Sequence, residues 1–276
     1  MKNKQSALKP AIFLHIQKTA GSSMVALARL AYGSDAVVSH GDYLSTSPKL
    51  TLDEVDNIST KGGRLPVPEG GVSKYRHASF VSGHFGFDFA KPLLSERYSF
   101  TFLRNPVERV LSYYYFCLTR DPHEYEIYAL SQVLTLDQFL MLGIERPALK
   151  ACIWNNQAWQ LADGYGNSKG QSILSFSPDE ILELAIRHLD NFSYIGFAES
   201  FEEDRDYILK ALGLVPPKTK IVSNANPGRP TARDLPASTL ELLDELTHLD
   251  RELYKVAWQR KPSFIEKHFK RWLPFK

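Results

Sequence analysis

Residues 11–23 read AIFLHIQKTAGSS, an apolar run followed at once by a short polar turn. The apolar part, residues 11–16, is typical of a parallel strand that is buried on both faces, because such strands read as continuous hydrophobic runs. Residues 22–32 are rich in Ala, Leu, Met and Val and stop at Gly33, which predicts a helix with a glycine cap. A strand, a small-residue turn and a helix therefore follow one another here.

The chain on either side of this unit alternates predicted strands with predicted helices. The further strands are expected at residues 37–38, 79–82, 98–104 and 191–198, and the further helices at residues 106–118, 148–162, 178–189, 200–212 and 237–258. Asn105 is a good N-cap for the first of these helices, Pro106 suits its first position, and Glu108 stands where a capping-box acid would. The alternation predicts an α/β fold in which helices flank a mostly parallel central sheet.

We find no internal repeat and no linker, so we expect a single domain over residues 1–276 with a flexible N-terminus at residues 1–10. Three segments lack a clear period. Residues 40–75 are interpreted as a surface excursion, or alternatively as a loop that shapes an acceptor site. Residues 214–235 contain four prolines and indicate a loop. Residues 255–276 contain seven Lys or Arg against one Glu and indicate a solvated basic face, or alternatively a surface for an acidic glycan or a membrane.

The composition places the chain among ordinary globular proteins. It has 276 residues, of which 43% are hydrophobic and 23% charged, and its formal net charge of +2 argues against nucleic acid as a partner. We predict no transmembrane segment, because no apolar run reaches the length that a spanning helix needs. The two cysteines do not make a disulfide framework, and no signal-peptide core follows the basic N-terminus, so a cytoplasmic location is expected. No metal is expected, because the sequence holds no C-x-x-C pair and no histidine pair at helical spacing.

The turn after residue 16 has the composition of a phosphate cradle. Backbone N–H groups at such a turn point toward one place, and the start of the following helix adds partial positive charge. The sequence lacks the Gly-Lys-Ser/Thr of a Walker A loop, which argues against an ordinary P-loop NTPase. A plain strand–helix turn stays an equal alternative on spacing alone. The candidate cradle residues are Lys18, Thr19, Ala20, Gly21, Ser22 and Ser23.

A second candidate segment, residues 104–115, reads RNPVERVLSYYY. Arg104 closes a predicted strand, and Ser112 follows the Asn105 cap by seven residues, which brings it back to nearly the same helix face. An arginine fork and a hydroxyl can thus converge on one anion. Glu108 and Arg109 are interpreted as helix-surface or capping residues, and the tyrosines at 113–115 as core.

Together, the HIQKTAGSS and RNPVERVLS segments resemble those of sulfotransferases that use 3′-phosphoadenosine 5′-phosphosulfate (PAPS). The resemblance is nearest to the carbohydrate branch, which is heparan sulfate 2-O-sulfotransferase-like, and to its bacterial relatives. It covers residues 11–34 and 79–118 well and residues 149–164 and 192–258 faintly. It implies a P-loop-like sulfotransferase fold in which residues 18–23 hold the 5′-phosphosulfate, while Arg104 and Ser112 hold the 3′-phosphate. The sequence departs from the family pattern at Gln17, where proline is usual, and at residues 155–159, which lack the family's arginine.

Sulfuryl transfer to a hydroxyl also needs a base, and histidine suits this role because its ordinary pKa is about 6.5. His84 lies just after a predicted strand, where the active sites of open parallel sheets collect. In related carbohydrate sulfotransferases the histidine of a similarly placed Gly-His-Phe segment is the base, which the resemblance carries over to His84. His15 is interpreted as a hydrogen-bonded core histidine, and His40 and His77 are the reserve candidates.

The sequence therefore predicts transfer of a sulfuryl group from PAPS to an acceptor hydroxyl, expected on a carbohydrate or another small molecule, in a bacterial cytoplasmic enzyme. His84 would act as general base, and Lys18 would stabilise the charge of the leaving 3′,5′-adenosine bisphosphate. Two alternatives stay open: a nucleotide-dependent kinase with a variant P-loop, and a nucleotide-binding protein without turnover. If Arg104 and Ser112 prove not to hold the 3′-phosphate, Arg229 and Arg233 in the proline-rich loop come next.

Overall fold

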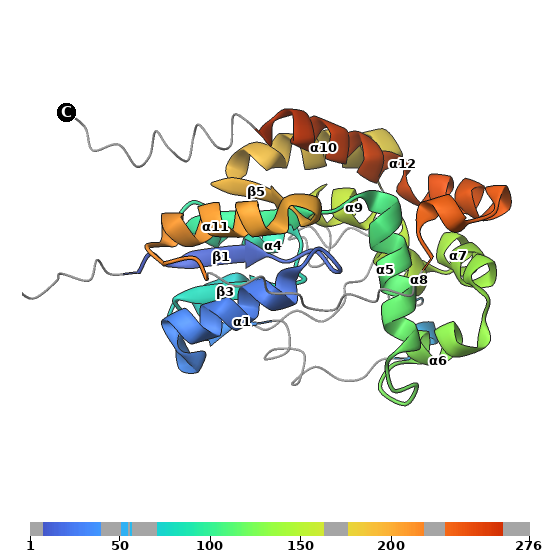
Figure 1. The fold of residues 1–276 in the computed structure, drawn as a ribbon, viewed down its shortest axis with the longest axis horizontal. Helices are drawn as coiled ribbons and strands as arrows, with labels where there is room; N and C mark the ends of the chain where they lie inside the picture. The colour runs from blue at the N-terminus through green and yellow to red at the C-terminus, as the bar shows by residue number, and fades with distance from the viewer. Residues whose placement is uncertain are drawn as a thin grey trace, which may run out of the picture.

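A computed structural model describes residues 8–39, 51–54, 56, 71–162, 176–217 and 230–261. Within these residues five strands form one sheet in the order β2-β3-β1-β4-β5, and every neighbouring pair is parallel. The strands are β1 (Ala11–Leu14), β2 (Val37–Val38), β3 (Phe80–Gly83), β4 (Tyr98–Leu103) and β5 (Tyr194–Phe197). All five lie where the sequence predicts a strand, and the predicted α/β fold is confirmed (Figure 1).

Helices cover both faces of the sheet. On one face lie α1 (Gly21–Tyr32) and α11 (Phe201–Leu212), and on the other α4 (Phe87–Leu94), α9 (Asn156–Ala162) and α10 (Pro178–His188), as Figure 1 shows. Right-handed crossovers explain this division, because the chain leaves β1 toward β2 in one direction and passes from β3 to β4 in the other. The Phe87 ring of α4 stacks on His188 of α10, with 3.6 Å between the ring centroids.

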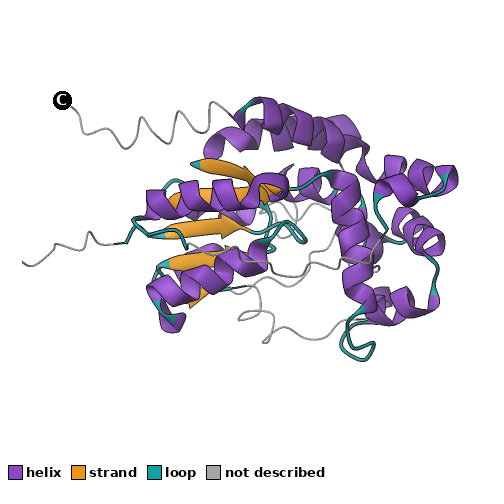
Figure 2. Cartoon of the chain, viewed as in Figure 1, coloured by secondary structure: helices purple, strands orange, loops and turns teal. Residues whose placement is uncertain are grey.

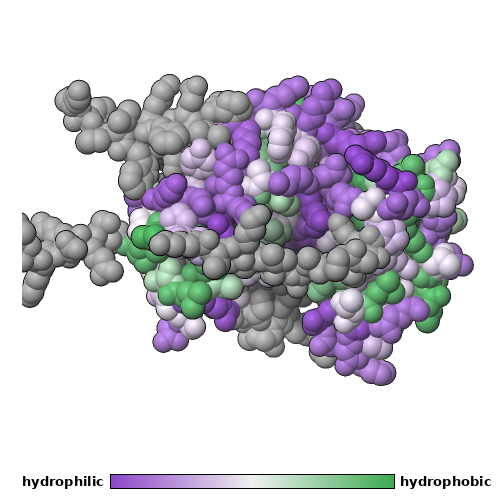
Figure 3. Space-filling model, viewed as in Figure 1, coloured by the Kyte–Doolittle hydropathy of each residue, from purple (hydrophilic) through white to green (hydrophobic). Residues whose placement is uncertain are grey.

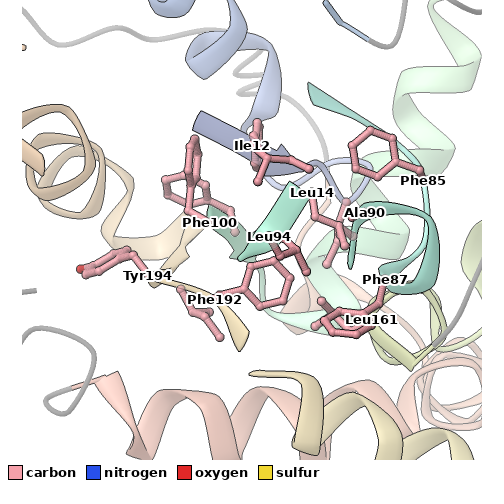
Figure 4. Packing of buried hydrophobic residues seen from close by; sticks show 14 of the residues in the cluster. Ile12, Leu14, Phe85, Phe87, Ala90, Leu94, Phe100, Leu161, Phe192 and Tyr194 are labelled. Atoms are coloured by element: carbon pink, nitrogen blue, oxygen red, sulfur yellow. The ribbon is translucent and has the colours of Figure 1, made fainter. Parts of the chain in front are cut away.

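The sheet core is aliphatic and aromatic. Every residue of β1 is fully buried, which the continuous apolar run requires of a central parallel strand. Figure 4 shows Ile12 and Leu14 of β1 among side chains of α4, including Ala90 and Leu94. The Phe13 ring of β1 stacks on Phe100 of β4, with 4.7 Å between the centroids.

A group of helices lies beside the sheet, and their buried side chains form a second hydrophobic cluster (Figure 2). Its elements are α5 (Pro106–Leu118), α6 (Glu126–Val133), α7 (Leu136–Glu145), α8 (Pro147–Ile153) and α12 (Ala237–Gln259). Helices α4, α6 and α7 were not expected from the sequence. Helix α4 contains Pro92, and α6 has only eight residues, so neither carries a strong periodic signal. Helix α7 carries a different local signal that the sequence does show, a capping box formed by Thr135 and Gln138.

The predicted caps are present where the structure describes them. The Asn105 side chain accepts a hydrogen bond from the Glu108 N–H at 3.2 Å, and Pro106 is the first residue of α5. Helix α11 ends at Gly213 and α1 at Gly33, both with the positive φ that favours glycine.

The helix predicted over residues 148–162 is wrong, because α8 and α9 are separate helices. Asn155 lies between them with a φ of 41°, which no helix interior adopts. Its side-chain oxygen accepts hydrogen bonds from the backbone N–H groups of Leu249 and Asp250 in α12. A partner more than ninety residues away in the chain thus breaks the helix, and local propensity cannot reveal this.

Several predicted irregular segments are described only in part. Of the predicted flexible N-terminus the structure describes residues 8–10, and there the Lys9 carbonyl accepts a hydrogen bond from the Tyr32 hydroxyl at 2.7 Å. Within residues 40–75, Leu52 is buried in the helical cluster. Most of that segment, residues 218–229 of the proline-rich loop and residues 262–276 of the basic tail lie outside the described residues.

The described surface shows apolar side chains scattered singly. Leu30 on α1, Val133 on α6 and Met141 on α7 are exposed, and Figure 3 shows green atoms at separate places on the face in view. Scattered exposed residues of this kind are normal for globular proteins. In the part of the chain that the structure describes, every helix is too short or too polar to span a membrane.

Candidate active site

The carboxyl ends of the three central strands bring the candidate residues to one edge of the sheet. His15 follows β1, His84 follows β3 and Arg104 follows β4. The ladder runs one step beyond β1, because the His15 N–H donates to the Gly83 carbonyl at 2.9 Å. In Figure 1 the arrowheads of the strands point toward α5, which stands across this edge. Open parallel sheets bind their ligands at such an edge, where the strand order reverses.

The predicted cradle is an irregular turn held by its own residues. Lys18 and Ala20 adopt left-handed backbone conformations, with φ of 67° and 73°, which is unusual for residues other than glycine. Thr19 is fully buried, and its hydroxyl donates to the Ile16 carbonyl at 2.8 Å. No side chain caps the first turn of α1, which begins directly after Ala20. Such alternation of backbone handedness is the geometry of anion-binding nests.

Glycine is required at position 21 because the His15 imidazole occupies the space of a side chain. A Cβ built on Gly21 would overlap the ring of His15. Ser22 is exposed at the start of α1, whereas Ser23 is buried. The cradle therefore presents backbone and one exposed hydroxyl on the outside while Gly21 packs inward.

Lys18 joins the cradle to α5. Its ammonium lies 3.8 Å from the centre of the Phe116 ring, a cation–π contact. Ser112 lies four residues before Phe116 in the same helix, so both are on one helix face. Ser112, which is partly exposed, is thereby on the side of α5 that contacts the cradle.

Arg104 lies beside the cradle from the other direction. Its Nη1 donates to the Lys18 carbonyl at 3.0 Å. The backbone of Arg104 is held on both sides by Gln157 of α9, which accepts from the Arg104 N–H and donates to the Arg104 carbonyl, each at 2.9 Å. The two segments singled out in the sequence thus meet in space, and the anion that each would hold stays a prediction.

His84 is held in one tautomer. Its Nδ1 lies 2.6 Å from the His15 carbonyl, and a carbonyl oxygen can only accept, so Nδ1 carries the proton. The lone pair is then on Nε2. The pKa of His84 is lowered to about 4, chiefly by burial; the bond to the His15 carbonyl opposes the shift, and the charge of Lys18 adds to it. His84 is therefore a neutral imidazole at physiological pH.

The other candidate histidines differ from His84. His15 was expected in the core, yet the residue is partly exposed, as His84 is, and the two ring centroids lie 4.3 Å apart. His77 is exposed and precedes β3, so it lies at the opposite edge of the sheet from the cradle. His40 and Arg229 lie outside the described residues, and Arg233 is exposed.

Arg109 was expected on the helix surface, and this expectation is wrong. The side chain is fully buried, and its guanidinium donates to the side chain of Asn156 and to the carbonyls of Cys152 and Ile153. These acceptors belong to α8 and α9 or the turn at their junction, and local sequence around Arg109 gives no sign of them. The expectation that tyrosines 113–115 are core is confirmed for Tyr113 and Tyr114, which are both buried.

Residues 155–159, which depart from the family pattern, form part of the scaffold. Asn155, Asn156 and Gln157 are buried, and each is hydrogen-bonded to another helix or to a strand end. Among the described residues, no group of three or more His, Cys, Asp or Glu is arranged to hold a metal ion.

Comparison with known proteins is consistent with the fold. The model of the family described as the sulfotransferase family matches residues 9–255, which is most of the chain. Among curated proteins no relative matches the chain.

Proposed function

This chain belongs to the sulfotransferase family, and from that premise we propose that it moves a sulfuryl group from PAPS to a hydroxyl of a carbohydrate. The match over residues 9–255 supports sulfuryl transfer in general. The choice of donor and acceptor rests on the resemblance of the two segments to the carbohydrate branch and on the chemistry of the site. The single observation that carries the proposal is the neutral His84 beside the Lys18 cradle at one sheet edge.

The cradle residues suit a phosphosulfate. The left-handed turn at Lys18 and Ala20 and the uncapped start of α1 supply backbone donors and partial positive charge. Lys18 and Arg104 add two cationic side chains, and the Arg104 guanidinium donates to the Lys18 backbone carbonyl. When bound, PAPS supplies the activated sulfuryl group. Residues 18–23 would hold its 5′ end, while Arg104 and Ser112 would hold its 3′-phosphate.

The proton transfer is assigned to His84. Its Nε2 would take the proton of the acceptor hydroxyl while the acceptor oxygen bonds to sulfur and the bond from sulfur to the phosphate oxygen breaks. Lys18 would stabilise the negative charge that collects on the departing bisphosphate. Because the His15 carbonyl holds Nδ1–H, the imidazole presents Nε2 without first changing tautomer.

A ligand panel followed by turnover tests the proposal. In thermal unfolding of the full chain, 3′,5′-adenosine bisphosphate is expected to raise the midpoint, and ATP with magnesium is expected to raise it less. Transfer of labelled sulfuryl from PAPS to a panel of glycans then tests the acceptor. Stabilisation by ATP–magnesium alone would overturn the choice of donor, and transfer only to non-carbohydrate hydroxyls would overturn the choice of acceptor.

His84→Ala is the decisive variant. We expect turnover to fall by about two to four orders of magnitude, with bisphosphate affinity nearly intact, because the base contacts the acceptor rather than the nucleotide. Lys18→Ala is the matched contrast, since it should weaken nucleotide binding and turnover together. Near-normal turnover in His84→Ala would remove His84 from the mechanism.

A further inference from the structure

Gln160 of α9 contacts two backbone carbonyls beside the candidate base His84. Neither the sequence motifs nor the proposed function gives this glutamine a role. The side chain is fully buried. Its Nε2 donates to the His15 carbonyl at 3.1 Å and to the Phe85 carbonyl at 2.9 Å. The first of these carbonyls also accepts from His84 Nδ1 at 2.6 Å, and the second belongs to the residue that follows His84.

The orientation of the Gln160 amide follows from its partners. Both contacts are carbonyl oxygens, which can only accept, so the atom between them is the nitrogen. The amide oxygen Oε1 is buried and has no hydrogen-bond partner among the described residues. A buried acceptor without a partner destabilises the fold. Gln160 is therefore kept at a cost to stability, and what it contributes is its two N–H donors.

We propose that Gln160 is a positioning residue for the proton acceptor His84, holding both the carbonyl that selects the imidazole tautomer and the peptide that follows the imidazole. The proposal rests on the proposed function of His84. Without Gln160, the His15 carbonyl loses one of its two donors, and the Phe85 peptide loses its only described side-chain anchor. The His84 ring then gains freedom to turn and to move its proton to Nε2, which is the atom that must accept a proton.

A second glutamine of α9 also holds the backbone at the end of a strand. Gln157, three residues earlier in α9, holds the backbone of Arg104 through both atoms of its amide. Residues three apart share a helix face, so one face of α9 supports three strand ends. Gln160 supports the ends of β1 and β3 on the side of the base, and Gln157 supports the end of β4 on the side of Arg104.

The test compares the full-length wild type with Gln160→Leu, which removes the donors and keeps the volume. Exposed Gln132→Leu on α6 is the matched control, because it removes a Gln N–H that donates to the Arg120 carbonyl and not to the carbonyls beside His84. The first readout is the nitrogen NMR spectrum of the His84 imidazole. We expect one Nδ1–H tautomer in wild type and Gln132→Leu, and a mixture of tautomers in Gln160→Leu.

The second readout separates kcat from nucleotide affinity. Gln160→Leu should lower kcat by about 10–100-fold, because a misplaced reacting group costs about that much, while bisphosphate affinity stays within about 2-fold. His84→Ala combined with Gln160→Leu should be no slower than His84→Ala alone, since Gln160 acts through His84. A purely structural glutamine would lower the double variant further and weaken nucleotide binding.

An unchanged His84 spectrum together with unchanged kcat in Gln160→Leu would overturn the proposal. Should this variant fail to fold, as judged by circular dichroism, Gln160→Met takes its place; it has a similar length and flexibility but no donor, and the same two results are expected. The tautomer readout does not depend on turnover. If the wild type transfers no sulfuryl group but Gln160→Leu still shows the mixture of His84 tautomers, the proposed function is refuted and the coupling between Gln160 and His84 stands.

Discussion

His84 owes its chemical form to two contacts, one with the backbone and one with a neighbouring ring. The His15 carbonyl selects the Nδ1–H tautomer, and the His15 ring packs 4.3 Å away, which helps to bury the imidazole. Burial disfavours the charged form, and Lys18 adds repulsion, so the pKa falls to about 4. A histidine with that pKa is a weak base that stays available over the whole physiological pH range.

The pH profile of the free enzyme follows from this shift. The base must be neutral, so kcat/KM should be flat on its acid side down to about pH 5 and should fall only as the pH approaches about 4. An ordinary histidine would lose activity near pH 6.5. Initial rates at low substrate between pH 4.5 and 8 give the profile, and an acid limb near 6.5 would contradict the assignment.

The same shift makes a prediction about stability. Below pH 6.5 the unfolded chain binds a proton at His84 that the folded chain does not. The unfolding free energy is therefore highest, as far as His84 is concerned, above pH 6.5, and it decreases as the pH falls to about 4. His84→Asn should therefore show a smaller loss of unfolding free energy over this window than wild type in urea titrations. Identical pH dependence of the two proteins would be inconsistent with the lowered pKa.

The contact between Gly21 and His15 predicts a non-additive pair. Gly21→Ala should lower the unfolding free energy by about 1–3 kcal/mol, because the new methyl overlaps the His15 ring, which packs against Phe13 and His84. His15→Ala in the same chain removes the overlap, so the double variant should lose less than the sum of the two single losses. Urea unfolding of the four proteins measures this, and strictly additive losses would show that the two residues do not touch.

The Arg104 and Ser112 pair predicts the specificity for the 3′-phosphate. Arg104→Ala should weaken binding of 3′,5′-adenosine bisphosphate by about 2–4 kcal/mol and Ser112→Ala by about 1–1.5 kcal/mol. Both losses should nearly vanish for adenosine 5′-phosphate, which lacks the group. Titration calorimetry with both nucleotides measures the difference. Equal losses for the two nucleotides would mean that the pair acts elsewhere.

At the scale of elements, α9 and α12 hold each other's backbone. Asn155, just before α9, accepts from two N–H groups of α12, and Asp250 of α12 accepts from the Gln157 and Ala158 N–H groups at the start of α9. Burial raises the pKa of Asp250, and the charge of Arg109 is the largest effect that opposes the shift. The position of α9, and with it Gln157 and Gln160, thus depends on a polar network that spans three helices.

Arg109 tests that network. Arg109→Met should lower the unfolding free energy by about 3–5 kcal/mol, because it removes a charge that favours the ionised Asp250 and removes the hydrogen bonds to three buried acceptors. Arg120→Met is the control; its guanidinium pairs with Glu124 at the exposed surface, so a loss of under about 1 kcal/mol is expected. Urea unfolding followed by circular dichroism compares them. Similar small losses in both variants would show that Arg109 is not structural.

At the scale of the whole molecule, the site lies where two hydrophobic clusters meet. The sheet cluster carries the cradle and His84, and the helical cluster carries most of α5 with Phe116. Trp154 packs against both clusters, and the Arg109 network crosses between them. Because both contribute to one site, ligand binding should couple them.

We therefore predict one cooperative unfolding transition. Tryptophan fluorescence and far-ultraviolet circular dichroism should give the same urea midpoint, and bisphosphate at about 100 times its Kd should raise the unfolding free energy of the whole transition by about 2.7 kcal/mol. Two separated transitions, of which bisphosphate shifts only one, would show that the clusters fold as independent units.

The sequence alone was enough for features whose physical cause is local. An apolar run with no polar interruption is a buried parallel strand wherever it occurs, and Asn105 followed by Pro106 begins a helix through its own side chain and ring. The small residues at 18–23 predicted a phosphate cradle, and the place of His84 after a strand predicted a base; both roles stay predictions.

Only the tertiary structure decided what depends on distant partners. Arg109 is buried because α8 and α9 bring acceptors to it, and residues 148–162 are two helices because α12 bonds to Asn155. Gln160 lies beside His84 only because α9 packs where its amide meets the His15 and Phe85 carbonyls. Burial and hydrogen-bond partners arise from packing between residues far apart in the chain, and no local pattern encodes them.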